Sequence, residues 1–107
     1  MKNIFADIPE NLKNELFQTL LQTPGFRVER IVSHGHCSPE GFWYDQDEKE
    51  LVILLKGSAG LRFEGRDDVL VLYPGDYLHI DRYQRHRVEW TDPKQETIWL
   101  AVHYKNY

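Results

Sequence analysis

The spacing of hydrophobic residues changes once along the chain. From Ile8 to Gln22, apolar residues recur every three or four positions, a spacing typical of one face of an α-helix: Ile8, Leu12, Leu16, Phe17, Leu20 and Leu21. Asp7 can cap this helix, Pro9 suits its first turn, and Pro24-Gly25 would end it. The pattern predicts an N-terminal helical segment, residues 1–25, that packs on the rest of the chain or on a partner subunit.

From Phe26 onward, the pattern becomes that of short β-strands. Runs of alternating or continuous apolar residues are separated by turn residues such as Gly57, Gly65 and Pro74-Gly75-Asp76. The expected strands are 27–33, 42–45, 50–56, 59–64, 69–73, 77–80, 85–90 and 97–104. Short strands at this spacing, with no second helical pattern, indicate an all-β, antiparallel double-sheet sandwich or barrel over residues 26–107.

One predicted strand carries an acidic residue at its start. Glu50 is followed by five apolar residues and then by Lys56-Gly57. Because side chains alternate along a strand, Glu50, Val52 and Leu54 share a face. A carboxylate on a buried face is costly unless a cation or a hydrogen-bond donor meets it. Glu50 therefore either lies at a solvated strand end or lines an interior site.

Composition narrows the class of protein. The chain has 107 residues, enough for one domain, and a formal net charge of −4 that argues against nucleic-acid binding. The single cysteine, Cys37, fits a reducing compartment, and no apolar run approaches the roughly 20 residues of a membrane span. We expect a cytoplasmic protein with neither a nucleic-acid nor a membrane partner.

Two half-motifs resemble the cupin family, whose members are small jelly-roll β-barrels. Glu50 and Gly57 match the end of the first cupin motif, and Pro74-Gly75-Asp76, a short strand and His86 match the second. The resemblance covers about residues 27 to 104 and implies the jelly-roll fold. In metal-binding cupins, a His-x-His pair precedes the glutamate by three or four residues. Counting back from Glu50 places Trp43 and Asp45 at those positions, so the usual three-histidine, one-glutamate site is absent.

Two groups of residues are candidate metal ligands. If their strand faces point inward, Asp45, Glu50 and His86 converge on one cavity, and such a set suits a divalent ion such as Zn, Mn, Fe or Ni. His34 and His36 point to the same side of a strand and could join Glu50 and His86 if the following loop folds back. The alternatives are a buried hydrogen-bond network without a metal and an exposed loop edge. His79 and His103 are expected to be structural.

The aromatic residues offer a further candidate site. Trp43, Trp90 and Trp99 either line a cavity, where apolar walls hold a ligand and polar groups orient it, or fill the core. We therefore predict a ligand site formed by Trp43, Asp45, Glu50, His86 and Trp90. The first hypothesis is a module that binds a small polar or anionic molecule in the barrel.

The second hypothesis is a metal-dependent enzyme, resembling a dioxygenase, isomerase or hydrolase, that uses the same carboxylates and histidine. The resemblance implies either role, because cupins include both enzymes and binding domains, and the fold alone does not decide between them. It also implies a homodimer formed through sheet edges.

Overall fold

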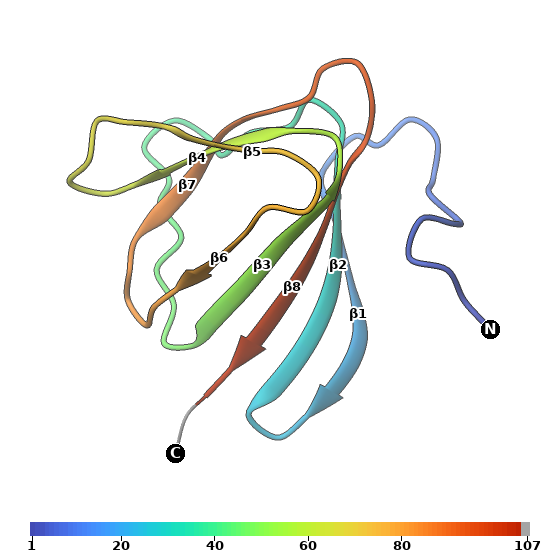
Figure 1. Ribbon diagram of the computed structural model, residues 1–107, viewed down its shortest axis with the longest axis horizontal. Helices are drawn as coiled ribbons and strands as arrows, with labels where there is room; N and C mark the ends of the chain where they lie inside the picture. Colours follow the sequence, from blue (N-terminus) through green and yellow to red (C-terminus); the bar gives the residue numbers. More distant parts are fainter. Residues whose placement is uncertain (106–107) are drawn as a thin grey trace.

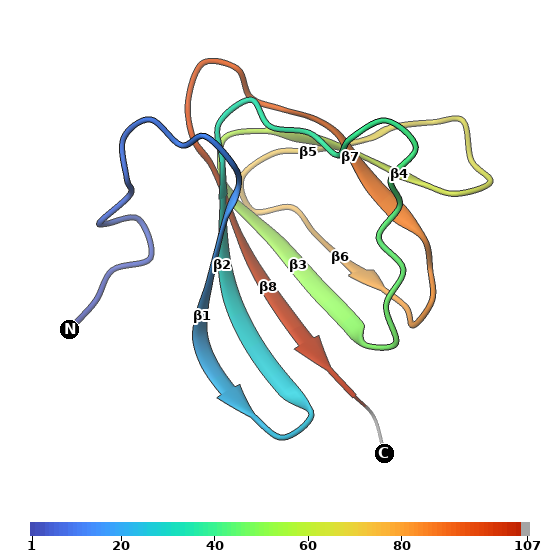
Figure 2. The same ribbon diagram turned by 180° about the vertical axis from the view of Figure 1, so that it is seen from behind.

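The computed structural model describes residues 1–105, which form two facing antiparallel sheets (Figures 1 and 2). The strands of the larger sheet, in spatial order, are β1 (Leu16–Thr23), β2 (Phe26–Ser33), β8 (Thr97–Tyr104), β3 (Lys49–Lys56) and β6 (Tyr77–Ile80). The smaller sheet contains β5 (Leu70–Leu72), β4 (Ala59–Phe63) and β7 (His86–Thr91). The predicted all-β, antiparallel double-sheet architecture is confirmed.

The predicted N-terminal helix is wrong, since residues 1–105 contain no helix. β1 occupies the second half of the expected helix and pairs with β2 as a hairpin across Pro24-Gly25, where Gly25 has a φ of 73°. A register shift between Thr19 and Leu21 makes Leu20 an extra residue, and this bulge produces apolar spacing that imitates a helix. Pairing along the whole of β2 outweighs the local helical pattern.

The remaining strands lie within a few residues of their predicted positions, with one exception. The expected strand 42–45 forms only an isolated bridge between Tyr44 and His86. β5 is also shorter than expected, and Leu72 is its only buried residue. The bridge nevertheless ties this segment to the start of β7, and it matters for the site described below.

The core lies between the two sheets. It contains Val52 and Leu54 from β3, residues of β4, β5 and β6, and Trp99 from β8. Along β3, Glu50, Val52 and Leu54 are buried while Leu51 and Ile53 are only half-buried. The predicted common face of Glu50, Val52 and Leu54 is therefore the inward one, and of the two alternatives for Glu50 the structure shows the interior position.

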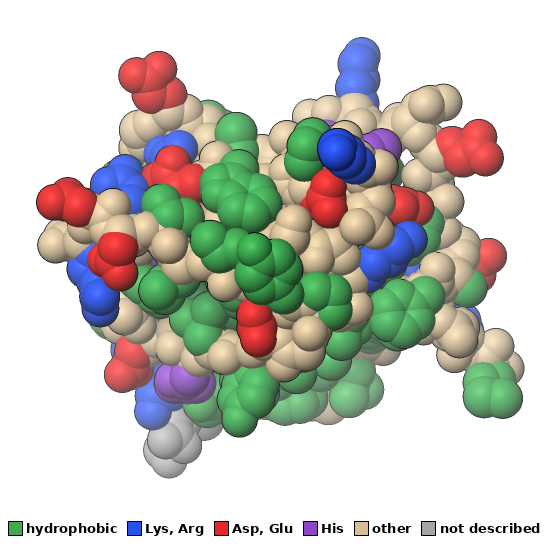
Figure 3. Space-filling model, turned by 45° about the horizontal axis from the view of Figure 1, so that its top comes forward, with side chains coloured by type: hydrophobic (Ala, Val, Ile, Leu, Met, Phe, Trp, Pro, Cys, Tyr) green, Lys and Arg blue, Asp and Glu red, His purple; other side chains and the backbone are tan. Residues whose placement is uncertain are grey.

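Several large hydrophobic side chains remain on the surface. Figure 3 shows one group of hydrophobic side chains across the middle of the face in view, with charged side chains around it. The more exposed ones include Leu20 and Leu21 on β1 and Val71 on β5. Nothing in residues 1–105 forms a helix long and apolar enough to cross a membrane.

Candidate functional site

A cavity of about 230 Å³ opens between the sheets. One part of its wall is apolar and is formed by Phe17, Ile31, Val52, Leu61, Ile80, Val88 and Trp99. The other part carries the polar groups of Glu15, Arg27, Glu29, Tyr44, Gln46, Glu50, His86 and His103. Most of these polar residues lie at the end of the barrel where β3 begins and β8 ends, the lower end in Figure 1.

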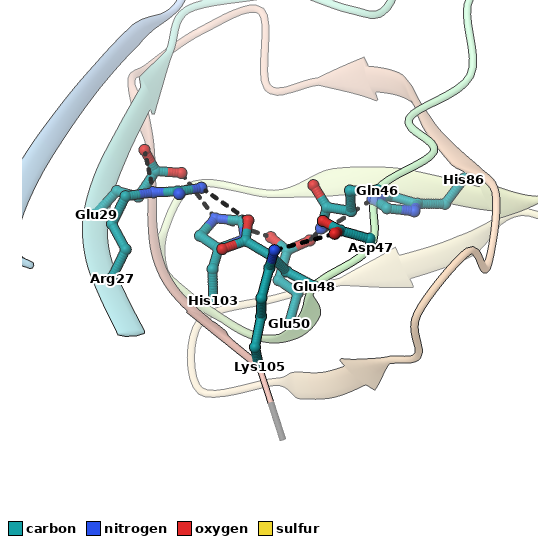
Figure 4. A network of polar contacts seen from close by, with 9 residues as sticks. All are labelled: Arg27, Glu29, Gln46, Asp47, Glu48, Glu50, His86, His103 and Lys105. Atoms are coloured by element: carbon teal, nitrogen blue, oxygen red, sulfur yellow. Dashed lines mark hydrogen bonds and ion pairs between the residues drawn. The ribbon is translucent and has the colours of Figure 1, made fainter. Parts of the chain in front are cut away.

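Glu50 is the buried carboxylate at the centre of the polar wall. The residue is 7% exposed and lies between His103 of β8 and Ile80 of β6 in the sheet register. Its Oε1 accepts a hydrogen bond of 3.1 Å from Nε2 of Gln46. Two imidazole nitrogens also face it, from His86 at 3.7 Å and from His103 at 3.9 Å (Figure 4). Both distances are too long for a direct hydrogen bond.

The hydrogen bonds of His86 define its neutral tautomer. Nδ1 lies 2.9 Å from the backbone carbonyl oxygen of Gln84. A carbonyl only accepts, so Nδ1 carries the proton, and in the neutral ring Nε2 is left as an acceptor. Nε2 faces Oε1 of Glu50, which is also an acceptor. In this neutral form, His86 and Glu50 present two lone pairs to the same small space.

His103 connects Glu50 to a second carboxylate. Its Nε2 lies 2.7 Å from Oε1 of Glu29, so Nε2–H donates to that carboxylate. Arg27 lies 3.7 Å from the other oxygen of Glu29 and 3.4 Å from Glu48. Figure 4 shows His103 between Glu29 and Glu50, with Gln46 and His86 on the other side of Glu50. Glu29 is thus well satisfied, whereas Glu50 accepts one side-chain hydrogen bond from the residues that the structure describes.

Tyr44 closes the polar wall beside His86. Their rings stack with centroids 5.3 Å apart, and two backbone hydrogen bonds join the residues. Burial, followed by the charges of Glu15, Glu50 and Glu29, raises the pKa of the Tyr44 phenol to about 12. Tyr44 therefore stays protonated and can donate a hydrogen bond at neutral pH.

Two of the predicted ligand residues lie outside the cavity. Trp43 packs against the outer face of the smaller sheet, with the guanidinium groups of Arg62 and Arg87 at 5.0 and 5.8 Å from its ring. Asp45 is exposed and lies 3.9 Å from Arg85. Because side chains alternate, Tyr44 and Gln46 take the inward positions that were expected for Trp43 and Asp45.

Trp90 also faces away from the cavity, although His86 and Val88 on the same strand line it. The pairing of β7 with β4 shifts register, so that Gly60 pairs with Trp90 while Leu61 pairs with Val88. The extra residue reverses the alternation after Val88. Trp90 consequently lies over Gly60, where a Cβ atom would meet its ring.

His34 and His36 are absent from the lining of the cavity. They lie just after β2, where Nδ1 of His36 accepts a hydrogen bond from the backbone N–H of His34. Nε2 of His36 lies 3.2 Å from the carbonyl oxygen of Lys13. Both ring nitrogens of His36 therefore have local partners. Of the predicted site residues, the structure brings together only Glu50 and His86.

The solved structures that resemble this chain include one at high sequence identity. A candidate mannose-6-phosphate isomerase from Ralstonia eutropha JMP134 is 47% identical, with a TM-score of 0.95 over 99% of this chain and 98% of that one. A cupin superfamily protein from Desulfitobacterium hafniense DCB-2 is 17% identical, with a TM-score of 0.74 over 92% and 84%. An RmlC-like cupin from Methanocaldococcus jannaschii is 15% identical, with a TM-score of 0.70 over 92% and 86%. The chain belongs to the cupin superfamily. No protein-family model and no curated protein matches its sequence.

The cupin fold corrects the counting of the first motif. With three residues between the His-x-His pair and the glutamate, the pair falls on Tyr44 and Gln46, and both side chains line the cavity. A metal at the cupin position would thus meet a phenol, an amide, Glu50 and His86. No group of three or more His, Cys, Asp or Glu side chains in residues 1–105 could hold a metal ion. These residues therefore do not fit the metal that the family resemblance implies.

Several polar residues of the site were not predicted from the sequence. Gln46 was missed because the longer of the two motif spacings was chosen. His103 was assigned a structural role, yet it pairs with Glu50 in the register of β3 and β8. Glu29 lies on β2, two residues from Arg27, which is opposite His103. Inward parity on adjacent strands is the signal that would have found His103 and Glu29, whereas Gln46 lies outside the strands.

Proposed function

We propose that this cupin binds a small organic molecule that donates hydrogen bonds to the polar wall of its cavity. The observation that carries this proposal is the pair of buried acceptors, Glu50 and His86, facing a mostly apolar space. Apolar walls supply affinity in such sites, while a few polar groups supply orientation. Buried acceptors that lack donors cost free energy, and a donor-bearing ligand would recover it.

The charge of the wall favours neutral or cationic ligands over anionic ones. Three carboxylates, from Glu15, Glu29 and Glu50, line the cavity beside one guanidinium, that of Arg27. Arg27 is already paired with Glu29 and Glu48. An anion would therefore meet net repulsion in a partly desolvated space. This argument narrows the earlier expectation of a polar or anionic ligand.

A set of small compounds sorted into cations, neutral hydrogen-bond donors and anions tests the proposal by ligand-observed NMR. Val88→Phe fills the cavity, and Val71→Phe places the same change on the exposed surface of β5. We expect cations and neutral donors to bind the wild type and the Val71→Phe variant, and binding to be lost in Val88→Phe. Absence of binding, or binding that Val88→Phe leaves unchanged, would contradict a ligand site in the barrel.

A second candidate is an isomerase, favoured by the 47% identity to the Ralstonia protein described above. Aldose–ketose isomerisation needs a base that removes a proton from one carbon and returns it to the next, and Glu50 is the buried carboxylate available. Among the residues that line the cavity, Arg27 is the one guanidinium that could bind the phosphate of such a substrate. We therefore rank the isomerase second. Formation of the ketose from mannose 6-phosphate, lost in Glu50→Gln, would establish it, and no turnover would exclude that substrate.

A further inference from the structure

The space between Glu50 and His86 has an unusual hydrogen-bond character. Oε1 of Glu50 and the lone pair of His86 Nε2 are 3.7 Å apart, and both residues are more than nine-tenths buried. In residues 1–105, no hydrogen bond reaches His86 Nε2. Gln46 donates to Glu50 through its Nε2, so its own amide oxygen adds a further acceptor to the wall. An occupant of this space must bring several donors.

Few chemical groups meet that requirement. A carboxylate or a phosphate dianion brings acceptors only, a hydroxyl brings one proton for at least two acceptors, and a water molecule brings two protons but no charge to balance Glu50. A primary ammonium group brings three N–H donors and a positive charge. Two acceptors 3.7 Å apart both lie within reach of one nitrogen at the usual charge-assisted distance of about 2.8 Å. The ammonium charge would also be balanced by the carboxylates of the wall.

We propose that Glu50 and His86 together bind the ammonium group of a small primary amine, whose apolar part lies in the cavity. This inference rests on the proposed function and names its ligand class. Glu50 supplies the negative charge, and His86, held in place by Gln84, supplies the neutral acceptor. Val52, Val88 and Trp99 provide the apolar surface for the rest of the ligand.

Three probes that share one ring and differ in the polar group test this assignment. Benzylamine, benzyl alcohol and benzoate are titrated into the wild type by calorimetry at neutral pH. We expect benzylamine to bind at least about ten-fold more tightly than benzyl alcohol, because a charge-assisted hydrogen bond is the stronger kind, and benzoate not to bind. Glu50→Gln should remove this preference, whereas Asp45→Asn, which neutralises an exposed carboxylate outside the cavity, should retain it.

A measurement on the wild type alone keeps the test independent of the variants. Benzylamine should shift the ¹⁵N resonance of His86 Nε2 as that atom becomes a hydrogen-bond acceptor, and should leave Nδ1, which donates to Gln84, nearly unchanged. Zinc or manganese salts are titrated in the same way. Stoichiometric metal binding that displaces benzylamine and is lost in Glu50→Gln would overturn the amine assignment in favour of a metal site.

The remaining outcomes distinguish failure of the ammonium site from failure of the proposed ligand-binding function. Equal affinity for benzylamine and benzyl alcohol, or tight binding of benzoate, would overturn the ammonium site while leaving a ligand-binding cavity in place. Failure of all three probes, together with failure of the charge-sorted compounds, would overturn both proposals.

Discussion

Glu50 and His86 come from different sheets, yet their side chains approach to 3.7 Å across the cavity. Each is held by its own neighbour, Glu50 by the amide of Gln46 and His86 by the carbonyl of Gln84. Neither side chain can turn away without breaking a hydrogen bond. When His86 is neutral, the described residues therefore place no donor between these two acceptors, and a substitution that supplies one should change stability.

Glu50→Gln is expected to stabilise the unligated protein. Gln46 and His86 both face Oε1 of Glu50, so an amide NH2 in the place of that oxygen can donate to His86 Nε2 and, once the Gln46 amide turns over, to the Gln46 oxygen. The substitution also removes a buried charge that has one hydrogen-bond donor. We expect a gain of about 1 kcal/mol in the free energy of unfolding, measured by urea denaturation. Asp45→Asn, made on an exposed carboxylate, should change stability by less than about 0.5 kcal/mol. A destabilised Glu50→Gln variant would mean that the carboxylate contributes to the fold.

The phenol of Tyr44 should ionise at a higher pH than that of a free tyrosine, because its pKa is raised. Its pKa of about 12 results from burial and from nearby glutamates, both of which disfavour the phenolate. The phenolate absorbance of the wild type and of Tyr44→Phe is measured as a function of pH. The difference between the two titration curves should show a transition near pH 12. Between pH 10 and 12 the unfolded chain loses this proton while the folded chain keeps it. The free energy of unfolding of the wild type, relative to that of Tyr44→Phe, should therefore fall as pH rises. A difference transition near pH 10 would refute the assignment.

The fold was predictable because strand patterns report burial directly. The alternation from Glu50 to Leu54 correctly placed Glu50, Val52 and Leu54 on one face, and the turn residues set most strand boundaries. Glu50 and His86 were found because each combines a polar side chain with an inward position. The sequence predicts which side chains face inward wherever a strand contains no bulge or register shift.

The errors occur where that regularity is broken. The bulge at Leu20 gave β1 a helical pattern, and the register shift between Gly60 and Leu61 turned Trp90 away from the cavity. Between β2 and β3, residues 34–48 form no extended strand. The alternation of inward and outward side chains therefore cannot be counted through this segment. That gap explains why Asp45 was chosen in place of Gln46. Bulges depend on pairing between strands, which a single sequence does not display.

Gly57, the last residue of the first cupin motif, is expected to tolerate no side chain. It has a φ of 83°, and an added Cβ would lie 2.8 Å from the backbone of both Glu96 and Thr97. Gly65 has a similar φ of 87° but open space around it. In thermal unfolding, Gly65→Ala should cost about 1–2 kcal/mol from the left-handed backbone alone, and Gly57→Ala clearly more. Equal losses would show that the contact with the Glu96–Thr97 backbone is relieved at no cost.

β1 forms one edge of the larger sheet, and its outer side is a candidate contact for the predicted homodimer. Leu20 and Leu21 are 50% and 54% exposed, and an edge strand with apolar side chains favours pairing with another strand. Two copies of β1 can pair antiparallel about a two-fold axis and bury both leucines. We expect sedimentation at micromolar concentration to show a dimer for the wild type and a monomer for the Leu20→Glu/Leu21→Glu double variant. Val71→Glu, on the exposed surface of β5, should remain a dimer. A wild-type monomer would exclude the homodimer, and a monomer produced by Val71→Glu instead would place the contact on the smaller sheet.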